Sequence, residues 1–228
     1  MPQKKVLTNQ DTGLLGLIAV LCMIIDHVGA AFFPGRDMIW MRIIGRTALP
    51  LFAWGIVVGA EHTRNIRRYL LRLLLLMAIS QIFYMGALNH WPPPFKFSIF
   101  ATLALGLVAI WGLKEKREWM TVIALLLSYY VPMDYGLSGV LCILLLWATR
   151  HNPLALAVCF AAYCVQWGGS GYVIWNAGFF QVRLQTAAML ALPLMLIPYA
   201  GRTKLPRWLM YAAYPAHLAV IWVIKSIL

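Results

Sequence analysis

The chain has 228 residues and a net charge of +12, yet only 11% of its residues are charged, against about 25% in a typical soluble domain. Hydrophobic residues make up 62% of it, and the mean hydropathy is +0.77. These values exclude an ordinary soluble domain. A strongly basic chain can bind nucleic acid, but here Lys and Arg gather in a few loops, as topology determinants do. We therefore expect no nucleic-acid partner.

Apolar stretches of about 20 residues follow one another along nearly the whole chain, as in proteins that cross a membrane many times. We predict an all-α fold, a polytopic integral membrane helical bundle with about nine transmembrane spans. Residues 1–12 would form an N-terminal tail and residues 13–228 a single transmembrane domain. The predicted spans are 13–33, 39–60, 65–88, 97–113, 118–133, 135–149, 152–168, 184–200 and 207–227.

One stretch between predicted spans has a different composition. Residues 166–181, "QWGGSGYVIWNAGFFQ", are rich in aromatic residues and glycine. Such a composition favours an interfacial loop or a short re-entrant segment.

Basic residues concentrate in every second connection between the spans. The outer connections hold at most one basic residue each, such as Lys96. By the positive-inside rule, the N-terminal tail is cytoplasmic and the C-terminus faces outward. The basic positions assigned to the cytoplasmic side are Lys4, Lys5, Arg64, Arg67, Arg68, Lys114, Lys116, Arg117, Arg150, Arg202, Lys204 and Arg207.

The first two spans carry ionisable residues in their outer halves. A charged residue at the centre of a span costs about 2.5–3.5 kcal/mol on insertion scales, so it is a functional-site hypothesis by default. Asp26 and His27 are adjacent in the first span. Arg42 and Arg46 begin the second span, and since they are four residues apart they share one helix face.

Helix geometry separates the roles of the adjacent pair. Successive side chains point about 100° apart, so Asp26 cannot easily orient His27 within the same helix. We expect Asp26 to pair with Arg42 or Arg46, which leaves His27 facing the interior as a neutral base. The alternatives are arginines that reach to lipid headgroups, a purely structural Asp–Arg pair, and a histidine that only bridges helices.

Three further polar residues fall at the same outer depth. Asp134 lies at the break between the fifth and sixth spans, and His217 lies near the middle of the last span, one turn after Tyr214. His217 follows Pro215, so it could instead satisfy the backbone hydrogen bond that the proline leaves open. Together with the first two spans, these residues predict a site in the outer half of the bundle.

The cytoplasmic side has its own basic cluster at the start of the third span. It either fixes topology or forms a groove for a phosphorylated cosubstrate, because paired guanidiniums suit phosphate recognition. The cluster consists of Arg64, Arg67, Arg68 and Arg72.

The four cysteines lack metal or redox spacing, so no metal is expected.

Several motifs, in order, resemble the TraX family of integral membrane proteins, which is associated with N-terminal acetylation of conjugative pilin. The motifs are "IIDHVGAAFFP", "RIIGRTALPLFA", "HTRNIRRYLLRLL", "AISQ", "FATLALGL", "DYGLSGVL", "LALPLML" and "YPAHL". The family is similar to the wider transmembrane acyltransferases, which use cytoplasmic acetyl-CoA. The resemblance therefore implies an acetyltransferase of the bacterial inner membrane that modifies pilin, a glycan or another envelope amine or hydroxyl.

The resemblance also implies roles for the flagged residues. His27, Asp26, His217 and Asp134 would form the catalytic group, and Arg42, Arg46 and Tyr214 would hold substrate or stabilise an oxyanion. The basic cluster would bind the phosphates of acetyl-CoA. Two other classes stay open: a proton-coupled transporter that uses Asp26, His27 and Asp134 as a relay, and a non-catalytic assembly factor for an envelope machine.

Overall fold

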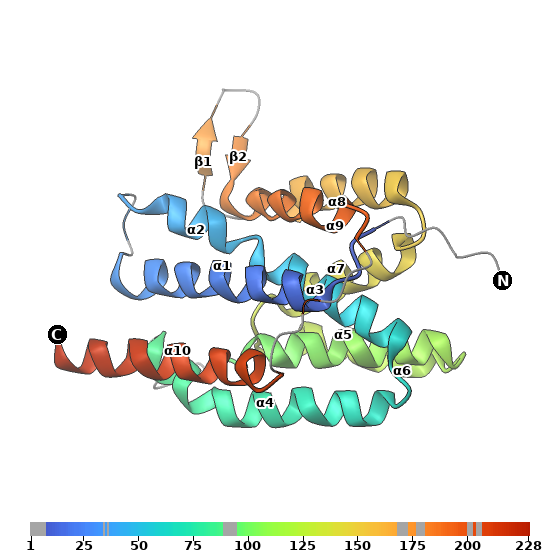
Figure 1. The fold of residues 1–228 in the computed structure, drawn as a ribbon, viewed down its shortest axis with the longest axis horizontal. Coiled ribbons are helices and arrows are strands. Elements are labelled where there is room, and N and C mark those ends of the chain that lie inside the picture. Colours follow the sequence, from blue (N-terminus) through green and yellow to red (C-terminus); the bar gives the residue numbers. More distant parts are fainter. Residues whose placement is uncertain are drawn as a thin grey trace.

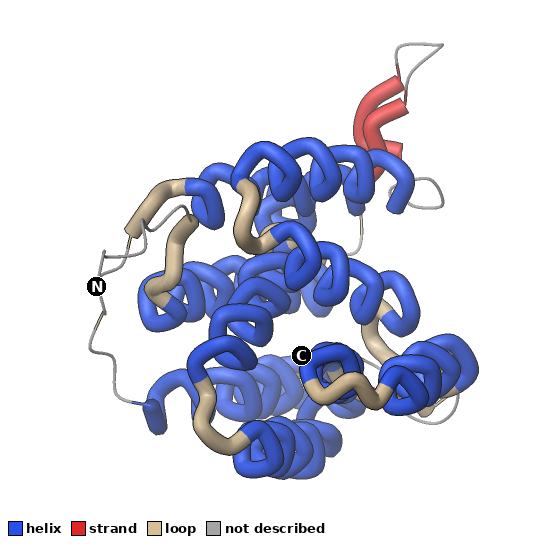
Figure 2. Tube along the Cα trace, turned by 90° about the vertical axis from the view of Figure 1, so that its right-hand side faces the viewer, coloured by secondary structure: helices blue, strands red, loops and turns tan. Residues whose placement is uncertain are grey.

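The computed structural model describes residues 8–33, 35, 37–88, 95–167, 173–176, 181–199, 203 and 207–228, with only the backbone described for 207–210. Most helices run along the long axis of the molecule and pack into a bundle, seen from the side in Figure 1 and along that axis in Figure 2. A small β-hairpin projects from the rim of the bundle.

The helices follow the predicted spans closely in the first two thirds of the chain. Five of them cover the first half: α1 (Thr12–Phe32), α2 (Ile39–Gly45), α3 (Ala48–His62), α4 (Ile66–Ala87) and α5 (Ile99–Lys114). Three more follow: α6 (Glu118–Tyr130), α7 (Gly136–Thr149) and α8 (Pro153–Trp167). The last part contains strands β1 (Val173–Asn176) and β2 (Gln181–Arg183), the 3-10 helix η2 (Leu184–Ala191), α9 (Leu192–Leu196) and α10 (Arg207–Ile227).

The second predicted span is interrupted, so that α2 and α3 are separate helices. The break falls at Arg46 and Thr47. Pro50 lacks the N–H that would bond to the carbonyl of Arg46, four residues earlier, and Thr47 Oγ1 bonds back to the carbonyl of Ile44 at 2.7 Å. The break therefore has a local cause.

The region around the eighth predicted span differs more. Residues 184–196 form a 3-10 helix followed by one short α-helix, with Pro193 unable to continue a regular hydrogen-bond ladder. The interpretation of 166–181 as a loop or re-entrant segment is wrong for its described strands. Val173 pairs with Arg183 and Trp175 with Val182 in an antiparallel ladder, as β-branched and aromatic residues favour. Residues 168–172 and 177–180 lie outside the described part.

The fold is mostly helical, as predicted, and has the character of a membrane protein. Three helical segments are long and apolar enough to cross a bilayer, namely Thr12–Phe32, Ile39–His62 and Ile66–Ala87. Four shorter apolar segments are Ile99–Lys114, Gly136–Thr149, Pro153–Trp167 and Leu184–Leu196. The number of nine crossings and the cytoplasmic N-terminus stay predictions.

Ion pairs bring the C-terminal ends of alternate helices together. Glu61, in the last turn of α3, lies 3.8 Å from Nζ of Lys114 at the end of α5 and 3.4 Å from Nε of Arg150 after α7. The indole of Trp147 donates to the same carboxylate at 3.2 Å. Helices α3, α5 and α7 therefore end on one side of the bundle, as alternate spans should.

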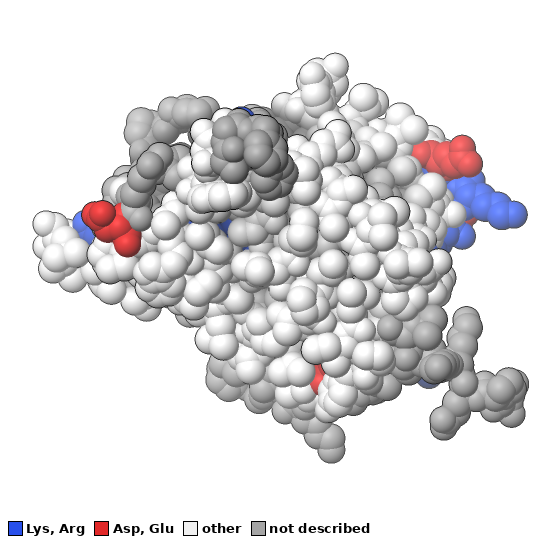
Figure 3. Space-filling view, turned by 90° about the horizontal axis from the view of Figure 1, so that it is seen from above, with Lys and Arg blue, Asp and Glu red and all other residues white. Residues whose placement is uncertain are grey.

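The outside of the bundle is apolar between its ends. Helix α3 is central and largely buried, whereas α4 exposes Leu71, Leu75, Ile79 and Ile82. On the face shown in Figure 3, charged side chains gather at the two ends of the long axis and few lie between them. This distribution suits contact with lipid around the middle of the bundle.

Asp11 fastens the start of α1 to the segment before α10. Its Oδ1 accepts from the amides of Gly13 and Leu14 at 3.0 and 3.1 Å, which caps the helix. Its Oδ2 accepts from the amide and hydroxyl of Thr203 at 2.8 and 2.5 Å. Burial opposes ionisation, but the hydrogen bonds from Thr203 and the α1 amides outweigh it and lower the pKa of Asp11.

We predict that Asp11→Ala lowers the free energy of unfolding by about 1–3 kcal/mol, because it removes a helix cap and the bonds to Thr203. Since the folded pKa lies below the ordinary value of 3.8, this contribution is present above that pH and is lost as the pH falls through the folded pKa. Thermal unfolding in detergent, followed by tryptophan fluorescence from neutral to acidic pH, measures it. Asp37→Ala, at an exposed position, is the control, and an equal loss in both variants would contradict the prediction.

Helices α1 and α2 approach each other closely at Gly45. A Cβ at this position would collide with the side chain of Asp26. Any larger residue therefore pushes the two helices apart or displaces the carboxylate.

We predict that Gly45→Ala destabilises the protein by about 1–3 kcal/mol despite the better helix propensity of alanine, because of this collision. The melting temperature in detergent is the measurement. Gly55→Ala is a matched control within α3, since a Cβ there meets no atom within 4 Å. A Gly45→Ala protein as stable as the Gly55→Ala protein would refute the close approach.

Candidate functional site

Asp26 is held between two arginines of the neighbouring segment. Arg46 Nη2 lies 2.8 Å from each oxygen of the Asp26 carboxylate. Arg42 Nη1 lies 3.0 Å from Oδ1 and donates to the backbone carbonyl of Asp26 at 2.9 Å. The pairing predicted with one arginine is thus present with both. Two guanidiniums against one carboxylate leave this buried group with one net positive charge.

His27 turns away from Asp26 and meets α10. Its Nδ1 lies 2.7 Å from Nε2 of His217, and the two rings are nearly parallel, with planes 16° apart. His217 Nδ1 in turn lies 2.7 Å from the carbonyl oxygen of Ala213. The carbonyl that Pro215 deprives of a helical donor is that of Tyr211, so His217 bonds a different one.

This chain of contacts determines which ring nitrogens carry protons. A carbonyl oxygen only accepts, so His217 Nδ1 must donate to Ala213. Neutral His217 then has a lone pair on Nε2, which accepts from Nδ1–H of His27. The proton of neutral His27 is therefore on Nδ1, and its Nε2 has a lone pair with no hydrogen-bond partner among the described residues. That nitrogen can act as a base.

Asp134 pairs with a lysine that the sequence did not single out. Lys96 Nζ lies 2.6 Å from Asp134 Oδ1, and the amide of Asp134 donates to the carbonyl of Phe97 at 2.9 Å. The side chain of Gln81 holds the backbone on both sides of Phe97, since it donates to the Lys96 carbonyl at 2.7 Å and accepts from the Ser98 amide at 3.1 Å. The one available signal in the sequence was a single lysine in an outer connection that has no other Lys, Arg, Asp or Glu.

These groups line one cavity of about 480 Å³, a volume typical of a small-molecule site. It contains five charged side chains, three cations and two carboxylates. Six of the predicted residues line it, namely His27, Asp26, Arg42, Arg46, Asp134 and Tyr214. His217 is not part of the lining but contacts His27. The sequence did not single out four other polar residues of the lining as part of a site: Lys96, Tyr84, Tyr135 and Gln185.

Gln185 brings η2 into the site. Its Oε1 accepts from Arg46 Nη1 at 3.3 Å, while its Nε2 is buried without a hydrogen-bond partner among the described residues. Arg46 Nε is likewise buried and has no partner in the described part of the chain. Two residues that line the cavity thus each carry one unsatisfied donor.

The four arginines of the predicted phosphate cluster lie elsewhere, on and before the first turns of α4. None of them lines the cavity with His27, and all are exposed. Arg72 Nη1 contacts the hydroxyl of Tyr211 at 3.5 Å, and Arg67 lies over the ring of Trp111. The structure therefore separates them from the ionisable group around Asp26. The four are Arg64, Arg67, Arg68 and Arg72.

A metal site finds no support in the part of the chain that the structure describes. No group of three or more His, Cys, Asp and Glu side chains there could hold an ion. The carboxylates of the cavity are instead bound by arginine and lysine.

Comparison with known proteins places the chain in a family. The sequence profile of the family described as TraX protein matches residues 12–225. The probable fimbrial assembly protein FimC, serogroup H1, of Dichelobacter nodosus is 39% identical over 74 residues, which is 31% of this chain and 30% of that protein. Protein TraX of Escherichia coli is 26% identical over 160 residues, 65% of this chain and 62% of that protein.

The match to either relative thus spans less than two thirds of that relative's length. No solved structure matches the chain. The family profile, however, runs from the first turn of α1 almost to the end of α10, and so includes every helix that contributes to the cavity. The chain belongs to the TraX family.

Proposed function

We propose that the protein is a membrane-embedded acetyltransferase, which moves an acetyl group from cytoplasmic acetyl-CoA to an amine or hydroxyl at the outer side of the membrane. The observation that carries the proposal is the histidine pair. His27 lines a charged cavity with an unprotonated Nε2, and His217 holds the ring in that tautomer through a 2.7 Å contact. A neutral imidazole so placed is suited to general base catalysis near neutral pH.

In the proposed reaction, His27 Nε2 takes the proton of the acceptor amine or hydroxyl as that atom attacks the thioester carbonyl. The new C–N or C–O bond forms, the C–S bond breaks, and the proton passes from His27 to the departing thiolate to give free CoA. A route through an acetyl-histidine has the same overall balance.

The tetrahedral oxyanion of this reaction would be stabilised by the positive side of the cavity. The group of Asp26, Arg42 and Arg46 has an excess positive charge, and the Arg46 Nε and Gln185 Nε2 donors have no partner among the described residues. Donors fixed before the reaction cost little reorganisation when charge develops. Asp26 then serves chiefly to hold the two guanidiniums in place.

The basic connections support an assignment of sides. Lys114 and Arg150 meet Glu61 at the end where α3 finishes, whereas the cavity adjoins the α2–α3 break at the start of α3. By the positive-inside rule, the basic end is cytoplasmic and the cavity lies in the outer half of the bilayer. The acceptor would enter from outside, across the inner membrane of a bacterium.

A proton-coupled transporter is a weaker candidate. A relay needs a group that passes the proton onward at each step, but the histidine chain ends on the carbonyl of Ala213. Lys96 also neutralises Asp134. The connected groups thus favour transient storage of one proton over its transfer across the bundle.

The acceptor we propose is a pilin or another envelope component. One relative is described as a fimbrial assembly protein, and family membership makes a role in pilus biogenesis or conjugation the nearest biological setting. Pilin N-termini and envelope glycans both offer a suitable amine or hydroxyl. A non-catalytic assembly factor would need no such base beside a charged cavity.

We predict that His27→Ala lowers acetyl transfer by a factor of about 10²–10⁴, because the general base is removed. The assay uses protein in lipid nanodiscs, radiolabelled acetyl-CoA and a panel of pilin N-terminal peptides and aminosugars. His151→Ala is the matched control, since this histidine is exposed and lies outside the cavity.

Two outcomes contradict the proposal. One is wild-type protein that moves no acetyl group to any acceptor of the panel. The other is a His27→Ala protein that is folded, as its melting temperature shows, and as active as His151→Ala.

We further predict that His217→Ala reduces kcat about 10- to 100-fold with little change in KM for acetyl-CoA, because it removes the group that positions His27. His217→Gln should recover part of the loss, since its amide oxygen can accept from His27 Nδ1. Steady-state kinetics of both variants measure the effect. Equal rates for the alanine and glutamine variants would show that the hydrogen bond to His27 is not needed.

A further inference from the structure

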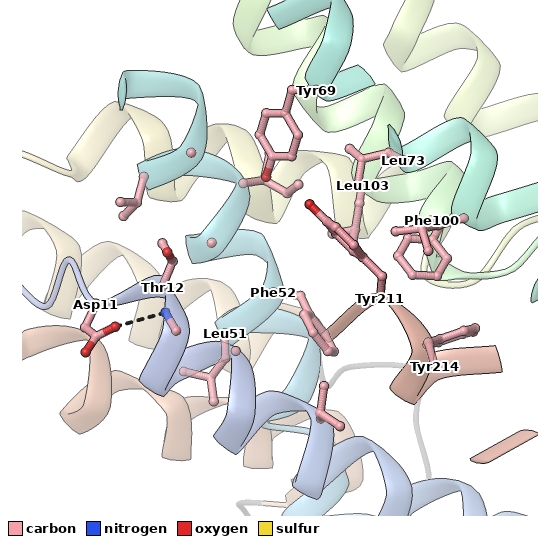
Figure 4. Close-up of a pocket in the computed structure, with 18 of the residues that line it drawn as sticks. Asp11, Thr12, Leu51, Phe52, Tyr69, Leu73, Phe100, Leu103, Tyr211 and Tyr214 are labelled. Atoms are coloured by element: carbon pink, nitrogen blue, oxygen red, sulfur yellow. Dashed lines mark hydrogen bonds between the residues drawn. The ribbon is translucent and has the colours of Figure 1, made fainter. Parts of the chain in front are cut away.

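A second cavity lies beside the first. It has a volume of about 600 Å³ and is lined by residues of α1, α3, α4, α5 and α10. One end is polar, with Asp11, Thr12 and Thr203, and the body is apolar, with Leu51, Phe52 and Leu103. In Figure 4, Asp11 and Thr12 lie on one side of this space and Tyr214 on the opposite side.

The two cavities meet at a thin wall. Among the described residues, Ile99 and Tyr214 alone line both. Tyr214 is only 3% exposed. Its ring packs edge to face against Phe100, with centroids 4.7 Å apart, and lies 6.2 Å from the His27 ring. One aromatic ring therefore separates the second cavity from the proposed base.

Helix α10 runs past both cavities. Tyr211 and Tyr214 line the second cavity, and His217 bonds His27 at the first. Successive members of this set are three residues apart and so neighbour each other on the helix surface, while Tyr211 and His217 lie about 9 Å apart along the axis and about 120° apart around it. The set begins beside the basic cluster, since Arg72 contacts the hydroxyl of Tyr211.

We propose that the second cavity is the donor chamber, which takes the acyl-pantetheine arm of acetyl-CoA, and that Tyr214 with Ile99 forms an internal partition between donor and acceptor. This inference rests on the proposed acetyl transfer. A long arm with amide groups and an apolar thioester end matches a cavity with a polar entrance and an apolar body. The phosphates would stay outside, near the exposed arginines of α4.

The partition would protect the thioester of acetyl-CoA from hydrolysis. The thioester can react with water, in which case the C–S bond breaks, a C–O bond forms, and acetate and free CoA are released. Tyr214 keeps the acceptor cavity and its water from the thioester until an acceptor is in place beside His27. Excluding water in this way prevents loss of the activated group.

The first test fills the donor chamber without touching the first cavity. Gly55 lines the second cavity, and a Cβ there meets no atom within 4 Å, so Gly55→Leu extends into the space. We expect KM for acetyl-CoA, and the Kd of a non-hydrolysable acetyl-CoA analogue, to rise at least about tenfold. Gly35→Leu is the matched control, because Gly35 is equally unhindered but lies in the α1–α2 connection.

The second test opens the partition. Tyr214→Ala should raise the release of CoA in the absence of acceptor at least about tenfold, whereas Tyr214→Phe keeps the ring and should raise it much less. A thiol reagent follows the released CoA. An alanine variant that leaks no more than the phenylalanine variant would overturn the role of Tyr214.

The outcomes separate this inference from the proposed function. Wild-type transfer with unchanged donor KM and Kd in Gly55→Leu would refute the donor chamber and leave the acetyltransferase standing. A phospholipid that co-purifies with wild type, is lost in Gly55→Leu and does not compete with the analogue would assign the cavity to lipid instead. Absence of any wild-type acetyl transfer would remove the proposed function itself.

Discussion

The pairing of Asp26 with Arg42 and Arg46 is the contact on which the arrangement of the site depends. A carboxylate buried in an apolar bundle is tolerated only when it is paired and hydrogen-bonded. Here both oxygens and the backbone carbonyl of Asp26 are bound by guanidiniums. The pairing joins α1 to α2, where Gly45 leaves room for the side chain. Because the next residue points about 100° away, the same contact turns His27 toward α10.

Helix α10 completes the site from the far end of the chain. His27 and His217 are 190 residues apart in sequence, and Asp11, at the start of α1, binds Thr203 in the segment before α10. These two contacts hold α1 and α10 side by side, so that His27 lies opposite His217. A fixed tautomer at His27 therefore follows from how the first and last helices are packed, together with one backbone carbonyl of α10.

Much of the fold was predictable, because apolar length is a local property. The helices α1, α4, α5 and α7 begin and end within a few residues of the predicted spans. Pro50 and Pro193 were visible in the sequence, but whether a proline kinks a helix or ends it depends on the neighbouring contacts. The hairpin of β1 and β2 was missed for a related reason: strand propensity is context-dependent, and aromatic, glycine-rich segments also suit interfacial loops.

The sequence by itself determined that the chain forms a helical membrane bundle, and it marked Asp26, His27, Arg42, Arg46, Asp134 and His217 as costly in lipid. It also paired Asp26 with the arginines, since helix geometry and charge neutralisation are short-range arguments. Only the tertiary structure decided that His27 bonds His217, that Lys96 binds Asp134, and that Gln185 reaches Arg46. The cost of a buried charge can be read from one position, whereas its partner depends on which distant helices pack side by side.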